Sequence, residues 1–224
     1  MSVKQNFAHI KENIKRASIS ISRNAEEIHI IAVTKYVSIQ RAKEAVDAGV
    51  QHLGENRDEG FLQKWDELKD TVSWHYIGTL QSRKVKNVVD KIDYLHSLDR
   101  VSLAEEIEKR ANKVINCFIQ VNTSEEKSKH GIQRSEVLPF IKQLEQFKKI
   151  KVVGLMTMAP FTDNEEIVRD CFRELRNLQQ KVQSLHLEHA PCKELSMGMS
   201  NDYIIAVEEG ATFIRIGSAL VGNE

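Results

Sequence analysis

The sequence predicts a single (β/α)8 TIM barrel with an extra helix at its amino-terminal end. Short apolar segments recur eight times along the 224 residues, helical patterns separate them, and no linker rich in proline or glycine interrupts the alternation. We therefore expect one domain, residues 1–224. A doubly wound open sheet is the structural alternative, because alternation of strands and helices does not require the sheet to close.

The predicted strands are short apolar runs, and the first is rich in β-branched residues, as expected for parallel strands buried on both faces. In chain order they cover residues 28–34, 52–54, 74–77, 94–98, 115–121, 151–156, 195–197 and 213–216. Ahead of them, Val3, Phe7, Ile10 and Ile14 follow helical spacing with lysines between them. This amphipathic segment lacks the unbroken apolar stretch of a signal peptide, so we expect a helix there.

Apolar stripes mark the helices between the strands. The clearest stripe consists of residues 167, 171, 175, 178, 182 and 185, and residues 39, 42 and 46 form a shorter one. Ser102, followed by Glu105, has the spacing of a capping box, and Ser135 is placed to cap the stripe that begins at Leu138. These signals predict helix starts near both serines.

Composition narrows the class of protein. Lysine and arginine total 32 against 32 aspartate and glutamate, so the formal charge is zero, which argues against nucleic acid and anionic membranes as partners. The three cysteines are far apart in the sequence and predict neither a disulfide framework nor a thiolate metal site. No apolar run is long enough to span a membrane. We expect a cytoplasmic protein.

Lys35 is the most informative single residue. It follows the first predicted strand, at the edge where both barrels and open α/β sheets bind substrates and cofactors. A partly desolvated ammonium there would lose a proton more readily than a solvated one and could attack a carbonyl as a free amine. We therefore predict Schiff-base chemistry at Lys35. The alternative is a lysine whose charged head only reaches solvent.

The last two predicted strands end in segments suited to an anion. Residues 196–202 leave a strand and enter a helix, so their backbone amides and the Ser200 hydroxyl can point at an anion. After the final strand, Gly217 permits close backbone approach and Ser218 adds a donor. Because the corresponding loops form the usual phosphate site of this barrel, we expect a phosphate there. Two ordinary turns capped by serine are the alternative.

An amine after the first strand, a phosphate site after the last two and Arg215 just before that site together describe a site for a flat phosphorylated aldehyde. Pyridoxal 5'-phosphate is such a molecule. The sequence also resembles the pyridoxal phosphate homeostasis proteins, which share the barrel domain of the alanine racemases. The matching motifs lie in order along nearly the whole chain, at residues 32–35, 54–56, 74–78, 80–81, 127–132, 154–156, 195–200 and 215–217.

The resemblance implies a cofactor site. Lys35 would hold pyridoxal 5'-phosphate as a Schiff base, Arg215 would face the pyridine nitrogen, and Lys129 would be a secondary lysine near the mouth of the pocket. The other implied cofactor-binding residues are Ser200, Gly217 and Ser218 for the phosphate, and Asn56 and His75 for the pocket walls. The differences from the family are small and affect none of the implied ligands.

Arg215 argues against robust catalysis. A guanidinium stays charged and only donates hydrogen bonds, so it would leave the ring nitrogen unprotonated and the cofactor a poor electron sink. In the racemases that the sequence resembles, a second acid/base group comes from an additional carboxyl-terminal β-domain, whereas this sequence stops soon after its last predicted strand. We therefore expect that the protein is not an enzyme with robust turnover.

These observations predict a cytoplasmic, monomeric protein that binds pyridoxal 5'-phosphate, buffers it and delivers it to apo-enzymes that need it, in the homeostasis of vitamin B6. One alternative is a small pyridoxal phosphate-dependent amino-acid racemase or lyase. Another is a barrel enzyme that acts on a sugar phosphate through Lys35.

Overall fold

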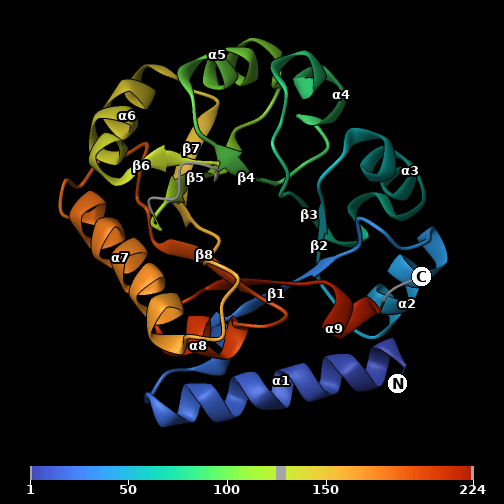
Figure 1. Ribbon diagram of the computed structural model, residues 1–224. Coiled ribbons are helices and arrows are strands. Elements are labelled where there is room, and N and C mark those ends of the chain that lie inside the picture. The colour runs from blue at the N-terminus through green and yellow to red at the C-terminus, as the bar shows by residue number, and fades with distance from the viewer. Residues whose placement is uncertain (1, 125–129, 223–224) are drawn as a thin grey trace.

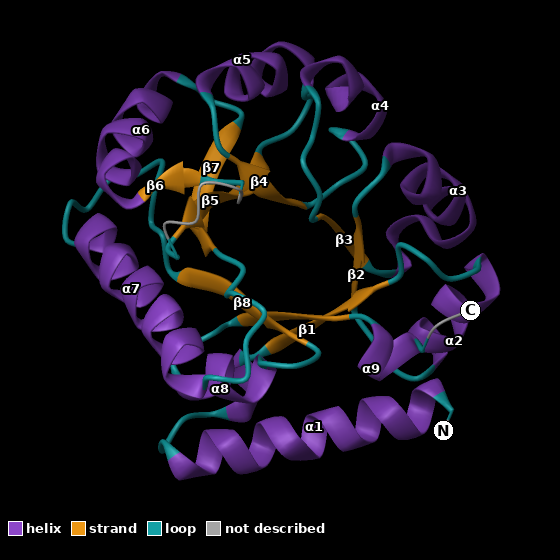
Figure 2. Ribbon diagram, in the orientation of Figure 1, coloured by secondary structure: helices purple, strands orange, loops and turns teal. Residues whose placement is uncertain are grey.

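The computed structural model describes residues 2–124 and 130–222, whose strands close into a barrel surrounded by helices (Figures 1 and 2). The ring follows the order β4-β3-β2-β1-β9-β8-β7-β5, and β4 pairs with β5 to close it. All of these pairings are parallel. The predicted (β/α)8 barrel is confirmed. The open sheet is excluded, because the two strands that would form its edges, β4 and β5, pair with each other.

The ring strands agree with the predicted strands to within two residues at each end. They are β1 (His29–Val33), β2 (His52–Glu55), β3 (Ser73–Tyr76), β4 (Tyr94–Leu98), β5 (Ile115–Asn122), β7 (Ile150–Met156), β8 (Glu194–Met199) and β9 (Phe213–Ile216). One further strand, β6 (Ile132–Gln133), pairs with the end of β5 outside the ring. It was not predicted, since two residues leave no periodic pattern.

The helices lie outside the ring of strands (Figure 2). They are α1 (Val3–Ser20), α2 (Ile39–Asp47), α3 (Asp58–Leu68), α4 (Val85–Val88), α5 (Val101–Arg110), α6 (Val137–Gln143), α7 (Glu165–Gln183), α8 (Tyr203–Glu208) and α9 (Ser218–Val221). Short 3-10 turns are η1 (Ala25–Glu27), η2 (Lys69–Thr71), η3 (Ser82–Lys84), η4 (Arg134–Glu136) and η5 (Leu144–Gln146). Within the described ranges, none of the helices has the length and apolarity needed to cross a bilayer.

The two predicted serine caps are wrong. Ser102 lies inside α5, because the N-cap position is occupied by Arg100, whose side chain forms no capping bond and instead donates a hydrogen bond of 2.7 Å to the Leu80 carbonyl. Ser135 lies inside η4, whose capping box is formed instead by Gln133 and Glu136. In both places the chain turns one or two residues before the serine, so its hydroxyl arrives too late to satisfy the first free amides.

The extra amino-terminal helix, α1, packs across the outside of α8 and α9 (Figure 1). Ser2 and Gln5 form a capping box at its start. Its buried face includes Ile10 and Ile14, and Asn13 donates a hydrogen bond of 2.9 Å to the Tyr203 hydroxyl. The helix therefore braces the segments that follow β8 and β9.

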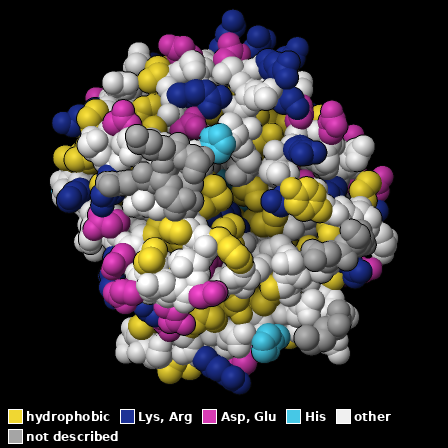
Figure 3. All heavy atoms as spheres, in the orientation of Figure 1, with side chains coloured by type: hydrophobic (Ala, Val, Ile, Leu, Met, Phe, Trp, Pro, Cys, Tyr) yellow, Lys and Arg dark blue, Asp and Glu magenta, His cyan; other side chains and the backbone are white. Residues whose placement is uncertain are grey.

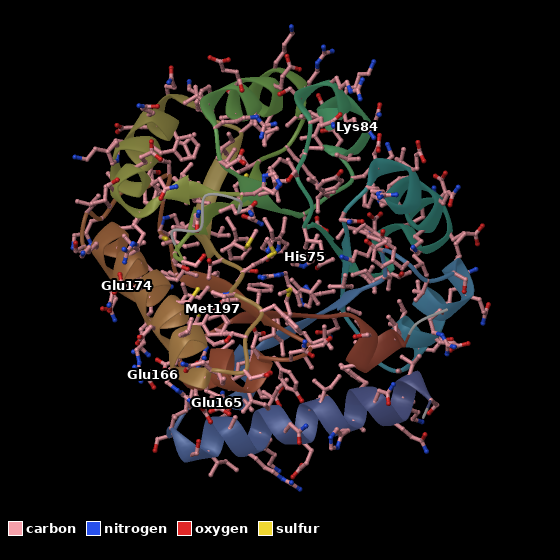
Figure 4. The ribbon with its side chains drawn as sticks, viewed as in Figure 1. His75, Lys84, Glu165, Glu166, Glu174 and Met197 are labelled. Atoms are coloured by element: carbon pink, nitrogen blue, oxygen red, sulfur yellow. The ribbon has the colours of Figure 1, made fainter. Side chains whose placement is uncertain are left out.

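The interior of the barrel is filled by rings. Barrels of this kind usually fill this space with branched aliphatic side chains. Here the ring-bearing residues in mutual contact, at centroid distances from 4.3 to 6.4 Å, are His29, His52, His75, Tyr94, His96, Phe118 and Phe213. Figure 4 labels His75 and shows it inside the ring of strands. These rings therefore form one connected cluster inside the barrel.

A buried ion pair joins α3 to the ends of β1 and β2. Lys64 lies 3.0 Å from the Glu55 carboxylate and donates a hydrogen bond of 2.9 Å to the Thr34 carbonyl. The Thr34 hydroxyl donates to the same carboxylate at 2.6 Å. Lys64 and Glu55 are 5% and 1% exposed. The network fixes the backbone immediately before Lys35.

Replacing Lys64 by methionine should lower the free energy of unfolding by about 3–5 kcal/mol, because Glu55 is left buried without its partner. Adding Glu55→Gln should recover much of the loss, since no unpaired charge remains. Urea unfolding measures both effects. The matched control is Lys43→Met, which removes an exposed pair with Glu67 and should cost less than about 1 kcal/mol. An equal cost for Lys64→Met and Lys43→Met would contradict this role of the buried pair.

Candidate functional site

A pocket of about 530 Å³ lies at the carboxyl ends of the strands. Residues from the ends of β1, β2, β8 and β9 line it, among them Lys35, Asn56, Ser200, Arg215, Gly217 and Ser218. The fold thus brings together six of the seven predicted cofactor-binding residues, which are far apart in the sequence. Figure 3 shows that the face viewed along the barrel axis is hollowed near its centre, with hydrophobic side chains around the hollow.

A larger hollow of about 640 Å³ lies between α1, η1 and the start of β1. We choose the smaller pocket as the candidate site for two reasons. Barrels of this kind bind their ligands at the carboxyl ends of the strands. Several polar groups also converge in the smaller pocket, and convergence of a few polar groups in an apolar cavity is typical of a ligand site.

Lys35 lies two residues after β1 ends and contributes to the pocket wall. The predicted partial desolvation is not found, because the side chain is exposed. Its ammonium lies 4.8 Å from the centre of the Tyr36 ring, which is itself 68% exposed. The amine is therefore accessible to a molecule that enters the pocket, and a cation–π contact holds it near the mouth.

Arg215 forms part of the pocket and is only 4% exposed. It donates hydrogen bonds of 2.6 Å to the Ser196 hydroxyl and 2.8 Å to the Thr157 carbonyl. Burial lowers the pKa of Arg215 to about 10, although the nearby Asp202 carboxylate opposes this shift. The guanidinium stays charged at neutral pH. Because it has five N–H groups, these two bonds leave donors for a ligand in the pocket.

The segments after β8 and β9 meet at one side of the pocket. The Ala219 amide lies 3.5 Å from the Ser200 hydroxyl, which it approaches as a donor. Gly198 has a φ of +90°, and a Cβ there would come 2.5 Å from Ala206, so only glycine fits this turn. A Cβ on Gly217 would meet only Val33, at 3.8 Å. The wall at Gly217 therefore leaves room the size of a small side chain.

Asn56 presents a buried acceptor that lacks a donor. Its Oδ1 atom has no hydrogen-bond partner among the described residues, and the residue lines the pocket. Gly78 packs directly against it, since a Cβ at that position would come 2.5 Å from the Asn56 carbonyl oxygen. A buried acceptor without a partner is costly, so a ligand that supplies a donor here would satisfy it.

His75 is the one predicted pocket residue that the pocket does not include. It is fully buried inside the barrel and stacks on Tyr94 at 4.5 Å. The reason is its position in β3: it comes before the end of the strand, and Ile77 and Gly78 reach the pocket instead. Direct contact between His75 and a ligand is therefore not expected. Lys129 lies outside the described residues.

Sequence reasoning missed several parts of the site. Lys64 was detectable, because it occupies the apolar face of α3 between Phe61 and Leu68, where a charged residue is unusual. Pocket-lining residues that were not given a role include Tyr36, Gln120, His130, Met158 and Met199. Met158 and Met199 are 38% and 37% exposed. Whether such residues line the pocket depends on how the loops fold, which the sequence pattern does not show.

Comparison with known proteins identifies relatives along the whole chain. The family model described as "Alanine racemase, N-terminal domain" matches residues 5–224. A protein of Aquifex aeolicus named "Pyridoxal phosphate homeostasis protein" is 38% identical over 227 residues, which covers 100% of this chain and 99% of the relative. The structure of PipY from Synechococcus elongatus with PLP bound is 30% identical, with a TM-score of 0.85, and covers 98% of this chain and 100% of PipY.

A more distant likeness concerns the fold alone. Alanine racemase from Corynebacterium glutamicum is 14% identical with a TM-score of 0.74, and the match covers 96% of this chain and 60% of the racemase.

The buried histidines should make the protein less stable in acid. Burial, with the nearby His29, lowers the pKa of His52 to about 4, whereas an unfolded histidine titrates near 6.5. Between these values the unfolded state binds more protons, so the free energy of unfolding should fall as the pH drops from about 6.5 to about 4. Burial also lowers the pKa values of His75 and His96 well below the ordinary value, which adds to the same trend.

Urea unfolding at a series of pH values measures this slope. His52→Asn, which keeps an acceptor near the Nδ1 position but cannot titrate in this range, should give a shallower slope than the wild type. Both proteins carry the same carboxylates, so the difference between the slopes reports His52 together with its effect on His75 and His96. Identical slopes would show that His52 does not carry the effect.

Proposed function

The chain belongs to the pyridoxal phosphate homeostasis protein family, which carries the alanine racemase N-terminal domain, and from this membership we propose that it binds pyridoxal 5'-phosphate in the pocket at the strand ends. The observation that carries the proposal is the convergence of six predicted ligands from four strands on one pocket. Chance would not be expected to place an accessible amine, a buried guanidinium and two serine hydroxyls in one cavity of about 530 Å³.

The residues present fit this cofactor. Arg215 offers N–H donors to a ring nitrogen, and the buried Asn56 acceptor matches the need for a donor such as a hydroxyl group. Ser200 and Ser218, beside the open space at Gly217, provide hydroxyl donors for a phosphate. When bound, the cofactor supplies an aldehyde carbon that a primary amine can attack.

We assign the attachment to Lys35, which is the lysine that lines the described pocket. Its uncharged amine would bond to the aldehyde carbon, and a water molecule would leave as the Schiff base forms. Hydrolysis reverses the step. The Lys64–Glu55 pair holds the backbone before Lys35, so the amine starts from a fixed point although its side chain is exposed.

The proposed role is to buffer and deliver the cofactor in vitamin B6 homeostasis, without robust turnover. Lys35 and Ser218 are both exposed, so another amine or water can reach the attachment point from solvent. Arg215 can only donate to the ring nitrogen and therefore does not help to protonate it, which keeps the cofactor a weak electron sink. Both properties favour reversible binding over catalysis. The proposed recipients of the released cofactor are apo-enzymes that require it.

Reduction with borohydride should fix the cofactor on Lys35. The loaded protein is reduced and digested, and mass spectrometry locates the pyridoxyl group. We expect it on the peptide that contains Lys35, and its loss in Lys35→Ala, because the accessible amine lies in the same pocket as Arg215. Lys43→Ala, at an exposed lysine on α2, is the matched control and should label as the wild type does. Labelling mainly at another lysine would rule out this attachment.

Delivery is tested by mixing the loaded protein with an unrelated apo-enzyme that requires pyridoxal phosphate, in the presence of a scavenger for free cofactor. The recovered activity of that enzyme should rise over minutes to hours, because the attachment point is open to solvent. Loaded protein fixed by borohydride is the control and should deliver nothing. If the cofactor stays bound for hours while alanine exchanges its α-hydrogen for deuterium at enzyme-like rates, the racemase alternative is favoured instead.

A further inference from the structure

Three histidines from successive strands form a hydrogen-bonded line through the barrel interior that ends on Arg215. His52 Nδ1 lies 3.0 Å from His75 Nε2, and His75 Nδ1 lies 2.8 Å from His96 Nε2. His96 Nδ1 lies 2.9 Å from the Ser196 hydroxyl, which accepts from Arg215 at 2.6 Å. The described residues contain no cluster of His, Cys, Asp and Glu arranged to hold a metal, so these rings need another explanation.

Stacking holds the rings in place. His75 stacks on Tyr94 with an interplanar angle of 2°, and His96 stacks on Phe118 with a centroid distance of 4.3 Å. Both histidines are 0% exposed. Because these two rings are packed on their faces, their nitrogens at the ring edges remain available for the hydrogen bonds along the line.

Each ring carries a single N–H group. Burial and the neighbouring histidines lower the pKa of His75 well below its ordinary value, and burial together with the Arg215 charge does the same for His96. His52, at the half-buried end of the line, is also neutral at pH 7 because burial lowers its pKa to about 4. A neutral imidazole donates through one nitrogen and accepts through the other, so every link has one donor and one acceptor.

Arg215 fixes the direction of the line. A guanidinium only donates, so Ser196 accepts from it, and the Ser196 hydroxyl proton needs an acceptor. Within the described residues, His96 Nδ1 is the acceptor within reach of that hydroxyl. His96 must then donate through Nε2 to His75, and His75 through Nε2 to His52. The reverse direction would leave the buried Ser196 proton without a partner.

We infer that Ser196, His96, His75 and His52 form one directional hydrogen-bond chain that positions Arg215, so that its remaining N–H groups are presented to the pocket above. The four act as positioning residues, since Arg215 alone of the five lines the pocket. The inference concerns the protein without ligand and stands whether or not the pocket binds pyridoxal phosphate.

The direction can be measured in the ligand-free protein labelled with ¹⁵N-histidine. Long-range ¹H–¹⁵N spectra at pH 7 show which ring nitrogen carries the proton, because protonated and unprotonated nitrogens resonate far apart. We expect the Nε2–H form for His52, His75 and His96. An Nδ1–H or doubly protonated form at any of the three would overturn the inference. This measurement on the wild type does not depend on any variant.

Two substitutions of Arg215 test whether it sets the direction. Arg215→Lys keeps a donor and should leave all three histidines in the Nε2–H form. Arg215→Glu offers an acceptor to the Ser196 hydroxyl, so Ser196 can accept from His96, and the three rings should switch to the Nδ1–H form. The same forms in both variants would show that Arg215 does not set the direction.

The positioning role is tested by a matched pair at His96. Asparagine and leucine have nearly the same shape and lose the bond to His75 equally, but only asparagine keeps an acceptor near Nδ1 for Ser196. In ¹H–¹⁵N spectra the guanidinium signals of Arg215 should stay in slow exchange with water in His96→Asn and be lost in His96→Leu. Loss of the signals in both variants would mean that packing of the imidazole ring, and not the bond to Ser196, positions Arg215. Retention in both would mean that His96 does not position Arg215 at all. Either result would overturn the proposed role.

Discussion

Arg215 places a permanent positive charge inside a parallel barrel, and the barrel interior is arranged to hold it. The side chain is 4% exposed, and its bonds to Ser196 and the Thr157 carbonyl connect β9 to β8 and to the residue that follows β7. A buried cation with poor partners would be expelled or deprotonated. A hydroxyl of β8 and a carbonyl just after β7 therefore bind this guanidinium, and their positions set its position at the floor of the pocket.

Histidines replace the usual aliphatic filling beneath that floor. An imidazole buried in its neutral form can bond to polar neighbours at both ends and still stack on aromatic rings, which an isoleucine or leucine cannot do. His75 and His96 use both properties. The cost appears in acid, because each ring must give up the hydrogen bond that it accepts in order to bind a second proton. The benefit is a line of hydrogen-bonded side chains that crosses the barrel interior and ends at Arg215.

The upper part of the site has the opposite character. Lys35 and Ser218 are exposed, Tyr36 is 68% exposed, and these residues lie beyond the ends of the strands. Rigid elements beneath an open mouth suit the proposed role, which requires a cofactor to be held firmly and still be released. Glycines at 198 and 217 fit the same pattern, one allowing a tight turn and the other leaving space in the wall.

The eight ring strands and the amphipathic first helix could be predicted from the sequence, because hydrophobic periodicity is a local property. Six of the seven predicted cofactor-binding residues line one pocket, because the carboxyl ends of parallel strands meet at one edge of the barrel; their roles toward the cofactor stay predictions. The buried place of His75, the Lys64–Glu55 pair and the histidine chain could not be predicted. The place of His75 and the histidine chain depend on which residues of different strands share a layer inside the closed ring, and that is decided by strand register and closure. The Lys64–Glu55 pair depends on how α3 packs against the ends of β1 and β2. The sequence by itself determined the order of the elements and the chemistry at their ends; only the tertiary structure decided which polar side chains meet inside the barrel, because contacts between distant strands have no signature in either strand alone.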